Sequence, residues 1–135
     1  MGTLLDAFAL VAFFEDEPAA PEVGRLIAAR DASMSTVNLA EAGQRILRHS
    51  DVTSEELRQL VGSLPLALVP YTVAHAWRAA ELRARHYHRR DSSVSFADCC
   101  LVAAATPADR VATADPAVLR MAEGEGIGTV ELPRP

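Results

Sequence analysis

Residues 4–14 of the chain read LLDAFALVAFF, and this stretch decides how the remaining sequence is interpreted. Its two leucines form a short apolar run of the kind found in strands, and Asp6 follows them directly. From residue 7 to residue 14, apolar side chains recur at helical spacing until the acidic run at residues 15–17 ends the helix. A strand that passes straight into a helix favours a fold in which strands and helices alternate.

The same alternation continues along the rest of the chain. Further strands are expected at residues 32–35, 66–69, 110–113 and 128–132, and helices at residues 21–29, 36–50, 53–60, 72–87, 95–105 and 116–122. Strands separated by helices predict an α/β domain with a mostly parallel sheet and helices on both of its faces. Ligands of such sheets bind beyond the carboxyl ends of the strands.

Two of these segments have a distinctive apolar pattern. Residues 66–69 read LALV between two prolines, which is typical of a buried strand. In the helix at residues 72–87, apolar side chains recur at helical spacing at Val73, Trp77, Ala80 and Ala84. Both segments are therefore interpreted as regular elements rather than loops.

The chain has 135 residues, of which 50% are hydrophobic and 23% charged, and this composition predicts one globular domain over residues 1–135. Its 13 basic and 18 acidic residues give a net charge of −5, which disfavours non-specific adhesion to nucleic acid. All 13 basic residues are arginine, so chemistry that needs a catalytic or phosphate-binding lysine is excluded.

Cysteine usage and hydropathy bear on where the protein works. Cys99 and Cys100, the only cysteines, are adjacent, which excludes a disulfide framework or a four-ligand cysteine zinc site. No uninterrupted apolar stretch approaches the roughly 20 residues that a spanning helix needs, so no membrane segment is expected. We therefore expect a cytoplasmic protein.

Four carboxylates stand close to the carboxyl ends of expected strands: Asp6, Glu41, Asp98 and Asp115. In a parallel sheet these ends meet at one edge, so the four side chains are expected to lie near one another. Like charges at about 4 Å repel by several kcal/mol at an effective dielectric constant near 20, so such a cluster needs a cation or raised pKa values. A divalent ion bound by oxygen ligands satisfies this need most simply.

Each acid also has a purely structural interpretation. Asp6, Asp98 and Asp115 all stand where a side-chain oxygen caps the N-terminus of a helix. Glu41 precedes Arg45 by four residues, which is the spacing of an ordinary exposed helix pair. Taken singly, an acid in such a position is more often structural than functional, and only the joint placement of the four favours a site.

A basic stretch precedes the expected helix at residues 95–105. We expect nucleic-acid contacts from its arginines, Arg83, Arg85, Arg89 and Arg90. Tyr87 could stack on a base. The alternative is that a basic helix end simply complements the helix dipole. His86 and His88 are two residues apart and point to different helix faces, which argues against a shared metal.

Four short motifs carry a resemblance to a known family: LLDA at residues 4–7, STVNLAE at 35–41, SFADC at 95–99 and TAD at 113–115. With these motifs in this order, the sequence resembles the PIN-domain ribonucleases, and most closely the VapC-type toxins of bacterial toxin–antitoxin pairs. The resemblance implies a three-layer α/β/α domain with a four- or five-stranded, mostly parallel sheet in the order 3-2-1-4-5. One departure is Phe8, where many relatives carry a small polar residue.

The resemblance also implies a chemistry. It makes Asp6, Glu41, Asp98 and Asp115 the acids that bind Mg²⁺ or Mn²⁺, supported by Thr113 and Asn38. It implies an endoribonuclease in which the ion lowers the pKa of a bound water that attacks the phosphodiester. Whether Glu41 is a ligand or a proton acceptor stays open at this point.

The partners that the resemblance implies are an RNA substrate and a cognate antitoxin protein. The family usually forms a homodimer, and a heterotetramer or larger assembly forms with the antitoxin. Two alternatives belong to other classes of function. A phospho-accepting receiver domain would need a lysine near the last strand and paired acids after the first, and neither is present. A catalytically silent interaction domain would keep the fold for binding a partner and tolerate the loss of Asp6 or Asp98.

Overall fold

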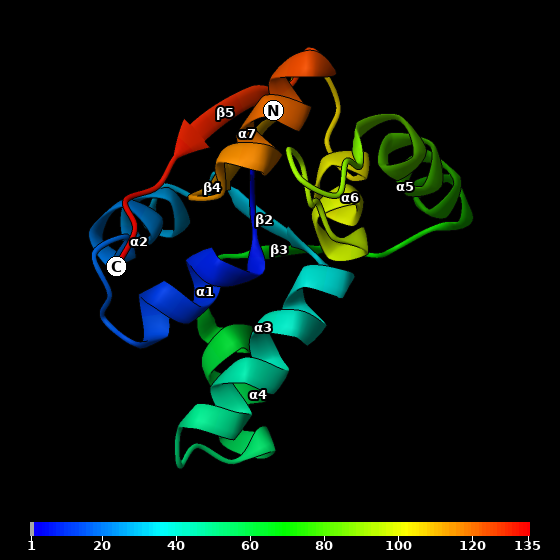
Figure 1. The fold of residues 1–135 in the computed structure, drawn as a ribbon. Helices are drawn as coiled ribbons and strands as arrows, with labels where there is room; N and C mark the ends of the chain where they lie inside the picture. Colours follow the sequence, from blue (N-terminus) through cyan, green and yellow to red (C-terminus); the bar gives the residue numbers. More distant parts are fainter. Residues whose placement is uncertain (1) are drawn as a thin grey trace.

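A computed structural model describes residues 2–135, which form a sheet covered by helices (Figure 1). The strands are β1 (Thr3–Leu5), β2 (Ala32–Ser35), β3 (Ala67–Val69), β4 (Arg110–Thr113) and β5 (Gly128–Glu131). The helices are α1 (Ala7–Phe14), α2 (Ala20–Ala28), α3 (Thr36–His49), α4 (Ser54–Ser63), α5 (Val73–His86), α6 (Phe96–Ala103) and α7 (Pro116–Gly124). The bounds expected from the sequence agree with these to within three residues.

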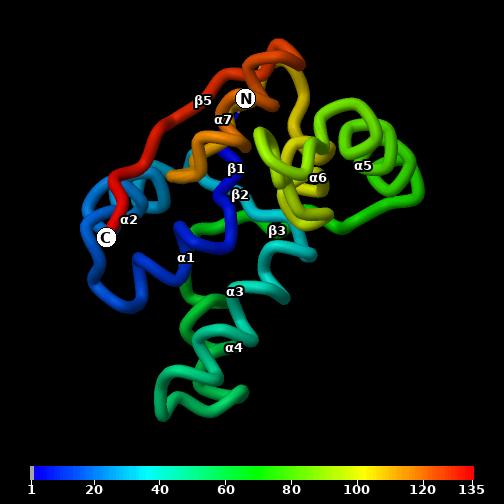
Figure 2. The backbone as a smooth tube through the Cα atoms, in the orientation of Figure 1, coloured from blue at the N-terminus to red at the C-terminus, as the bar shows by residue number. Residues whose placement is uncertain are grey.

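The strands of residues 2–135 lie in the order β3-β2-β1-β4-β5, and every neighbouring pair is parallel. The predicted α/β fold and the strand order 3-2-1-4-5 are therefore confirmed. Leu4 of the central strand lies opposite Ser33 of β2 on one side and Val111 of β4 on the other. Parallel neighbours require crossover connections, which the helices supply and which can be followed in Figure 2.

Two adjacent leucines in β1 account for the layers on either side of the sheet. Successive side chains of a strand point to opposite faces, so Leu4 and Leu5 enter different cores. Leu5 packs in a cluster with buried side chains of α1, α2, α3 and α4. Leu4 packs in a second cluster with α5, α6 and α7. The three-layer arrangement thus begins at the short apolar run that opens the chain.

The interpretation of residues 66–69 as a buried strand is wrong. β3 is the edge strand next to β2, and Leu68 in its centre keeps 44% of its surface exposed. The helices that would cover it, α3 and α4, extend together away from the sheet (Figure 1). Leu68 instead borders an open apolar hollow of about 490 Å³ between these two helices.

The apolar repeat of α5 lies on the exposed side of that helix. Val73 and Trp77 keep 76% and 69% of their surfaces exposed, whereas the buried side chains of α5 are Ala79 and Leu82. The helix is present as predicted, but its most apolar residues do not face the core.

No helix among residues 2–135 is long and apolar enough to cross a membrane.

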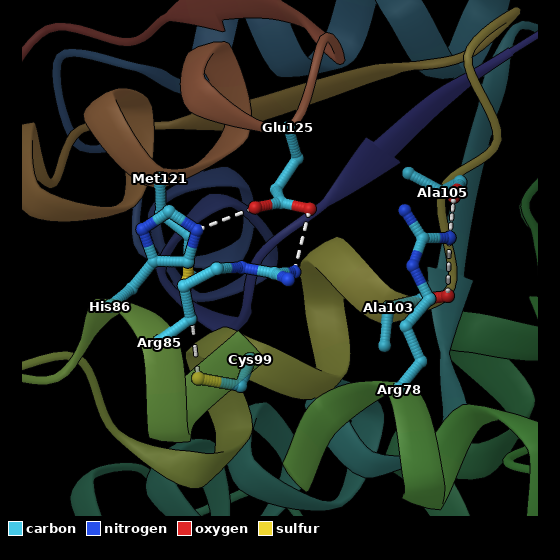
Figure 3. Close-up of polar contacts among 8 residues, drawn as sticks. All are labelled: Arg78, Arg85, His86, Cys99, Ala103, Ala105, Met121 and Glu125. Carbon is cyan, nitrogen blue, oxygen red and sulfur yellow. Dashed lines mark hydrogen bonds and ion pairs between the residues drawn. The ribbon is translucent and has the colours of Figure 1, made fainter. Parts of the chain in front are cut away.

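Polar contacts hold α5 against α7 (Figure 3). Glu125, which ends α7, accepts a hydrogen bond of 3.0 Å from Arg85 and lies 2.6 Å from Nε2 of His86. On the same helix, Arg78 donates to the carbonyl oxygens of Ala103 and Ala105 at 3.2 and 2.6 Å, at the end of α6. These contacts fix the position of α5 although its outer face is bare.

Candidate active site

Asp6 leaves the sheet at the end of β1 and begins α1. Its backbone N–H donates to the carbonyl of Ala112 in the neighbouring strand, and its Oδ1 accepts a hydrogen bond of 2.8 Å from the N–H of Ala9. Burial raises the pKa of Asp6 from 3.8 to about 6, against the lowering effect of hydrogen bonds from Thr113 and Ala9. The negative charges of Asp98 and Glu41 raise this pKa further.

Glu41 lies in the second turn of α3, which begins directly after β2. Burial and the charge of Asp98 raise its pKa, while Asn38 and Arg45 lower it. Asn38, one turn earlier, is buried and donates from Nδ2 to the carbonyl of Ala97 at 3.3 Å. Its Oδ1 is also buried and has no hydrogen-bond partner among residues 2–135. The expected exposed ion pair between Glu41 and Arg45 does not form within the described residues.

Asp98 belongs to a capping box that opens α6. The N–H of Ser95 donates to Oδ2 of Asp98 at 2.8 Å, and the N–H of Asp98 donates to Oγ of Ser95 at 3.1 Å. Burial raises the pKa of Asp98, and the charge of Asp115 raises it further. The capping bond engages Oδ2, and Oδ1 makes no hydrogen bond within the described residues.

Asp115 caps α7 at the end of β4. Its Oδ1 accepts a hydrogen bond of 2.9 Å from the N–H of Ala117, and its own N–H donates to Oγ1 of Thr113 at 3.1 Å. Thr113 is fully buried and also hydrogen-bonds Asp6. One hydroxyl therefore ties the ends of β1 and β4 together.

The structure brings the four acids predicted from the sequence to one place. They line a hollow of about 260 Å³, here called the acidic hollow, with Ala7, Phe8, Asn38, Gln44, Arg45 and Ala114. It lies beyond the carboxyl ends of β1, β2 and β4, where a parallel sheet presents its ligand site. The capping role and the shared hollow coexist, because each cap uses only part of a carboxylate.

The donor set of the acidic hollow fits a hard divalent cation. It offers carboxylate oxygens together with the unpartnered amide oxygen of Asn38, and oxygen ligands are those that Mg²⁺ and Mn²⁺ prefer. No three Asp, Glu, His or Cys side chains within residues 2–135 converge closely enough to grip one ion directly. An ion that keeps several waters, as Mg²⁺ does, suits this wider spacing.

The arginines of the basic stretch have different surroundings. Arg83 lies between the rings of Tyr87 and Phe96, at 4.3 and 4.4 Å from their centres, and donates to the carbonyl of Val94 at 3.2 Å. Arg85 is bonded to Glu125. Arg89 and Arg90 are exposed in the loop between α5 and α6.

Sequence reasoning missed two residues near the acids. Arg45 was considered only as a helix partner of Glu41, yet it lines the acidic hollow. Arg134 was not singled out, and its Nε donates to the carbonyl of Ala114 at 3.2 Å, between Thr113 and Asp115. Its sequence position carries no signal, because only the path of the chain after β5 brings it to β4.

Comparisons with known proteins agree with the fold and identify the family. The sequence profile of the family described as PIN domain matches residues 3–124. Among solved structures, the chain is similar to a toxin-antitoxin complex from Klebsiella pneumoniae, with 16% identity, 96% of both chains covered and a TM-score of 0.68. It is also similar to FitAcB from Neisseria gonorrhoeae, with 17% identity, 96% of both chains covered and a TM-score of 0.68.

A further similar structure is VapBC2 from Rickettsia felis bound to a DNA fragment from its promoter, with 13% identity, 98% of this chain and 100% of that chain covered, and a TM-score of 0.71. No curated protein sequence matches the chain. At these identities the solved structures support the fold alone, whereas the family match spans most of the sequence.

Proposed function

The chain belongs to the PIN-domain family, whose members are generally nucleases, and from that premise we propose that it is a metal-dependent endoribonuclease. The observation that carries the proposal is the acidic hollow, in which three of the four lining acids have raised pKa values. An RNA phosphodiester would be repelled by these carboxylates unless a cation lay between them. Mg²⁺ or Mn²⁺ is the cofactor that this chemistry requires.

In this proposal the acids divide into two roles. Asp6, Asp98 and Asp115 would hold the ion, directly or through water, with Asn38 Oδ1 as a further oxygen donor. When bound, the ion would supply a water of lowered pKa and neutralise charge on the phosphate. Glu41 lies at the exposed rim of the hollow, and its raised pKa suits a carboxylate that accepts a proton from the attacking water.

Thr113 acts on the ion-binding acids without touching the ion. Its hydroxyl bonds the side chain of Asp6 and the backbone N–H of Asp115, so it orients the Asp6 carboxylate and holds the backbone of Asp115 at the neighbouring strand end. Asn38 similarly links α3 to the start of α6 through the carbonyl of Ala97. Their role is to keep the acids together before an ion arrives.

The test is metal binding and cleavage measured on the same chain. Calorimetric titration with Mn²⁺ should show binding that Asp6→Asn weakens, and the same variant should lose cleavage of single-stranded RNA in Mg²⁺. Asn still caps a helix well, so the fold should survive. Equal Mn²⁺ isotherms for both chains, with no RNA cleavage by the parent chain, would favour the catalytically silent interaction domain.

We also propose that the protein acts as the toxin of a toxin–antitoxin pair. The similar structures from Klebsiella pneumoniae and Rickettsia felis are described as a toxin-antitoxin complex and as VapBC2 bound to promoter DNA, which motivates this role. A cognate antitoxin would then silence the enzyme in a heterotetramer or larger assembly. Producing the chain alone should arrest growth of its host, and the Asp6→Asn chain should not. Equal arrest by both would contradict a nuclease toxin.

The exposed apolar face of α5 is proposed as the contact of a homodimer. Val73 and Trp77 have the largest exposed fractions among the large hydrophobic residues that the structure describes, and their helix is held by α6 and α7. Trp77→Arg should convert a dimer to a monomer in light scattering at unchanged thermal stability. A monomeric parent chain would contradict this arrangement.

The exposed Arg89 and Arg90 remain proposed RNA contacts. Arg83 and Arg85, the other arginines of that stretch, are already engaged by protein groups, so they would contribute less. Neutralising Arg89 and Arg90 together should weaken RNA binding and flatten its salt dependence. Unchanged binding would restrict the basic stretch to the helix-dipole role.

A further inference from the structure

A second hollow of about 550 Å³ opens beside the acidic hollow and is lined by two arginines. We infer that Arg45 and Arg134 bind the RNA phosphate next to the one that is cleaved, with the ring of Phe8 against the intervening nucleoside. This inference rests on the proposed nuclease function and names the part of the site that holds the substrate strand. The second hollow, here called the arginine hollow, is lined by Phe8, Glu17, Arg45, Ala114, Asp115, Arg134 and Pro135.

The two hollows adjoin each other. Phe8, Arg45, Ala114 and Asp115 line both of them, so together they form a surface path from the acids to the arginines. An RNA chain whose scissile phosphate lies over the acids must extend away from them, and the arginine hollow offers a route that carries positive charge. The path therefore matches a polyanion that needs a cation at one phosphate and guanidinium groups at the next.

Arg45 and Arg134 are both available for a ligand. Arg45 is exposed and makes no ion pair or hydrogen bond among residues 2–135, although it lies one turn after Glu41 on α3. Arg134 donates from Nε to the carbonyl of Ala114, which anchors its guanidinium beside Asp115 and leaves the Nη groups free. Guanidinium groups suit bidentate bonds to a phosphate, and both arginines line the same hollow.

The acidic side chains of the arginine hollow form no ion pair with its arginines within the described residues. Glu17 has a buried Oε2 with no hydrogen-bond partner within the described residues. Burial and the neighbouring Glu15 raise the pKa of Glu17, whereas the charge of Arg45 lowers it. Asp115 is already engaged in capping α7 and faces the acidic hollow as well.

Phe8 gives the path an apolar surface between its two charged ends. It is half-buried in α1 and borders both hollows. Single-stranded RNA is commonly held by aromatic rings that stack on bases beside arginines that bind phosphates. This residue, where the family resemblance leads one to expect a small polar side chain, thus has a place in substrate binding.

The experiment measures RNA affinity separately from cleavage. A short single-stranded RNA is titrated onto the Asp6→Asn chain in Mg²⁺, and then onto the same chain carrying Arg45→Gln, Arg134→Gln or both. Arg58→Gln is the matched control, because Arg58 is an exposed arginine that borders the apolar hollow between α3 and α4. Thermal unfolding confirms that all variants fold.

For each arginine that contacts a phosphate, substitution by glutamine should reduce the slope of log affinity against log salt concentration by about 0.7. The double variant should reduce this slope by about twice as much. Affinity should fall roughly fivefold to tenfold per arginine at low salt, with no change for Arg58→Gln. The inference is overturned if the double variant keeps the affinity and salt dependence of the control, or if the parent chain binds no RNA. Cleavage retained by Asp6→Asn would instead contradict the proposed function, and the binding result would still stand.

Discussion

Two carboxylates at helix ends, Asp6 and Glu125, have opposite electrostatic surroundings. Asp6 caps the N-terminus of α1, where the helix dipole favours a negative charge, yet its pKa is raised to about 6. Glu125 ends α7, where the dipole disfavours a negative charge, yet the His86 hydrogen bond and the charge of Arg85 lower its pKa. Burial outweighs the dipole at Asp6, and the nearest partners outweigh it at Glu125. Glu125 is paired with Arg85 and His86, whereas Asp6 forms no ion pair within the described residues, which suits the metal ion proposed for it.

The largest expected effect is on the rate of RNA cleavage, compared between a variant of the acidic hollow and a variant of Glu125. Asp98→Asn removes one charge from the acidic hollow and should lower the rate of RNA cleavage at saturating Mg²⁺ by at least about 100-fold, since metal stabilisation contributes several kcal/mol. The capping box survives, because the amide oxygen of Asn can still accept from Ser95. Glu125→Gln is the matched control and should keep its cleavage rate within about twofold at a temperature where it is folded. A comparable loss in both variants would mean that the acidic hollow has no special role.

Stability without metal is the second test. The pKa of Asp6 is raised from 3.8 to about 6, so the folded chain binds this proton more tightly than the unfolded chain does. The resulting stabilisation is fully present below pH 3.8 and is lost as the pH rises through about 6. In EDTA, Asp6→Asn should therefore be more stable than the parent chain at pH 7, by at most about 3 kcal/mol, and by much less near pH 4.

Chemical denaturation in EDTA at both pH values measures this difference. Added Mg²⁺ should raise the stability of the parent chain and leave that of Asp6→Asn almost unchanged. A variant that is less stable than the parent at pH 7 in EDTA would show that the Asp6 carboxylate is satisfied by the protein, as Glu125 is.

The sequence was sufficient to predict the features that depend on strand-to-helix junctions. Asp6 and Asp115 cap helices that begin directly after β1 and β4, so their convergence follows once the sheet is parallel. Asp98 lies in the first turn of α6, where the capping box marks the start of the helix. Strand order followed from the family resemblance, since alternation alone leaves several orders open. Element types were also predictable, because helical and strand periodicity are local properties of the chain.

Features that depend on long-range placement were not predictable. β3 has the composition of a buried strand, but its burial depends on where α3 and α4 extend, and they leave Leu68 exposed. Arg134 lies next to Ala114 only because the chain turns toward β4 after β5. Apolar periodicity at Val73 and Trp77 identifies a helix without revealing whether the core or another surface meets that face.

The third test removes the charge of Glu125, the carboxylate that is paired within the protein. Glu125→Gln keeps the shape of the side chain but removes the charge that Arg85 and His86 contact. The contact is partly exposed, so we expect a loss of about 1 kcal/mol in the free energy of unfolding at pH 7. Because the pKa of Glu125 is lowered from 4.5, its stabilisation is present above that value and is lost as the pH falls through the folded pKa.

Denaturation of both chains across pH 3 to pH 7 checks this sign. The difference between parent and Glu125→Gln should be constant near neutral pH and shrink in acid, which is the reverse of the trend for Asp6. A difference that grows in acid would show that the α5–α7 contact does not depend on the ionised carboxylate.

The smallest expected effect concerns the hydroxyl that links the two strand ends. In the parent chain, the hydrogen bond from Thr113 lowers the pKa of Asp6. Thr113→Val keeps the volume of the side chain but removes this hydrogen bond. The pKa of Asp6 in the metal-free chain should therefore rise above 6, by less than about one unit for a single neutral hydrogen bond, as followed by carboxyl NMR titration. Thr113→Ser should restore it, and no shift in either variant would mean that burial alone sets the charge of Asp6.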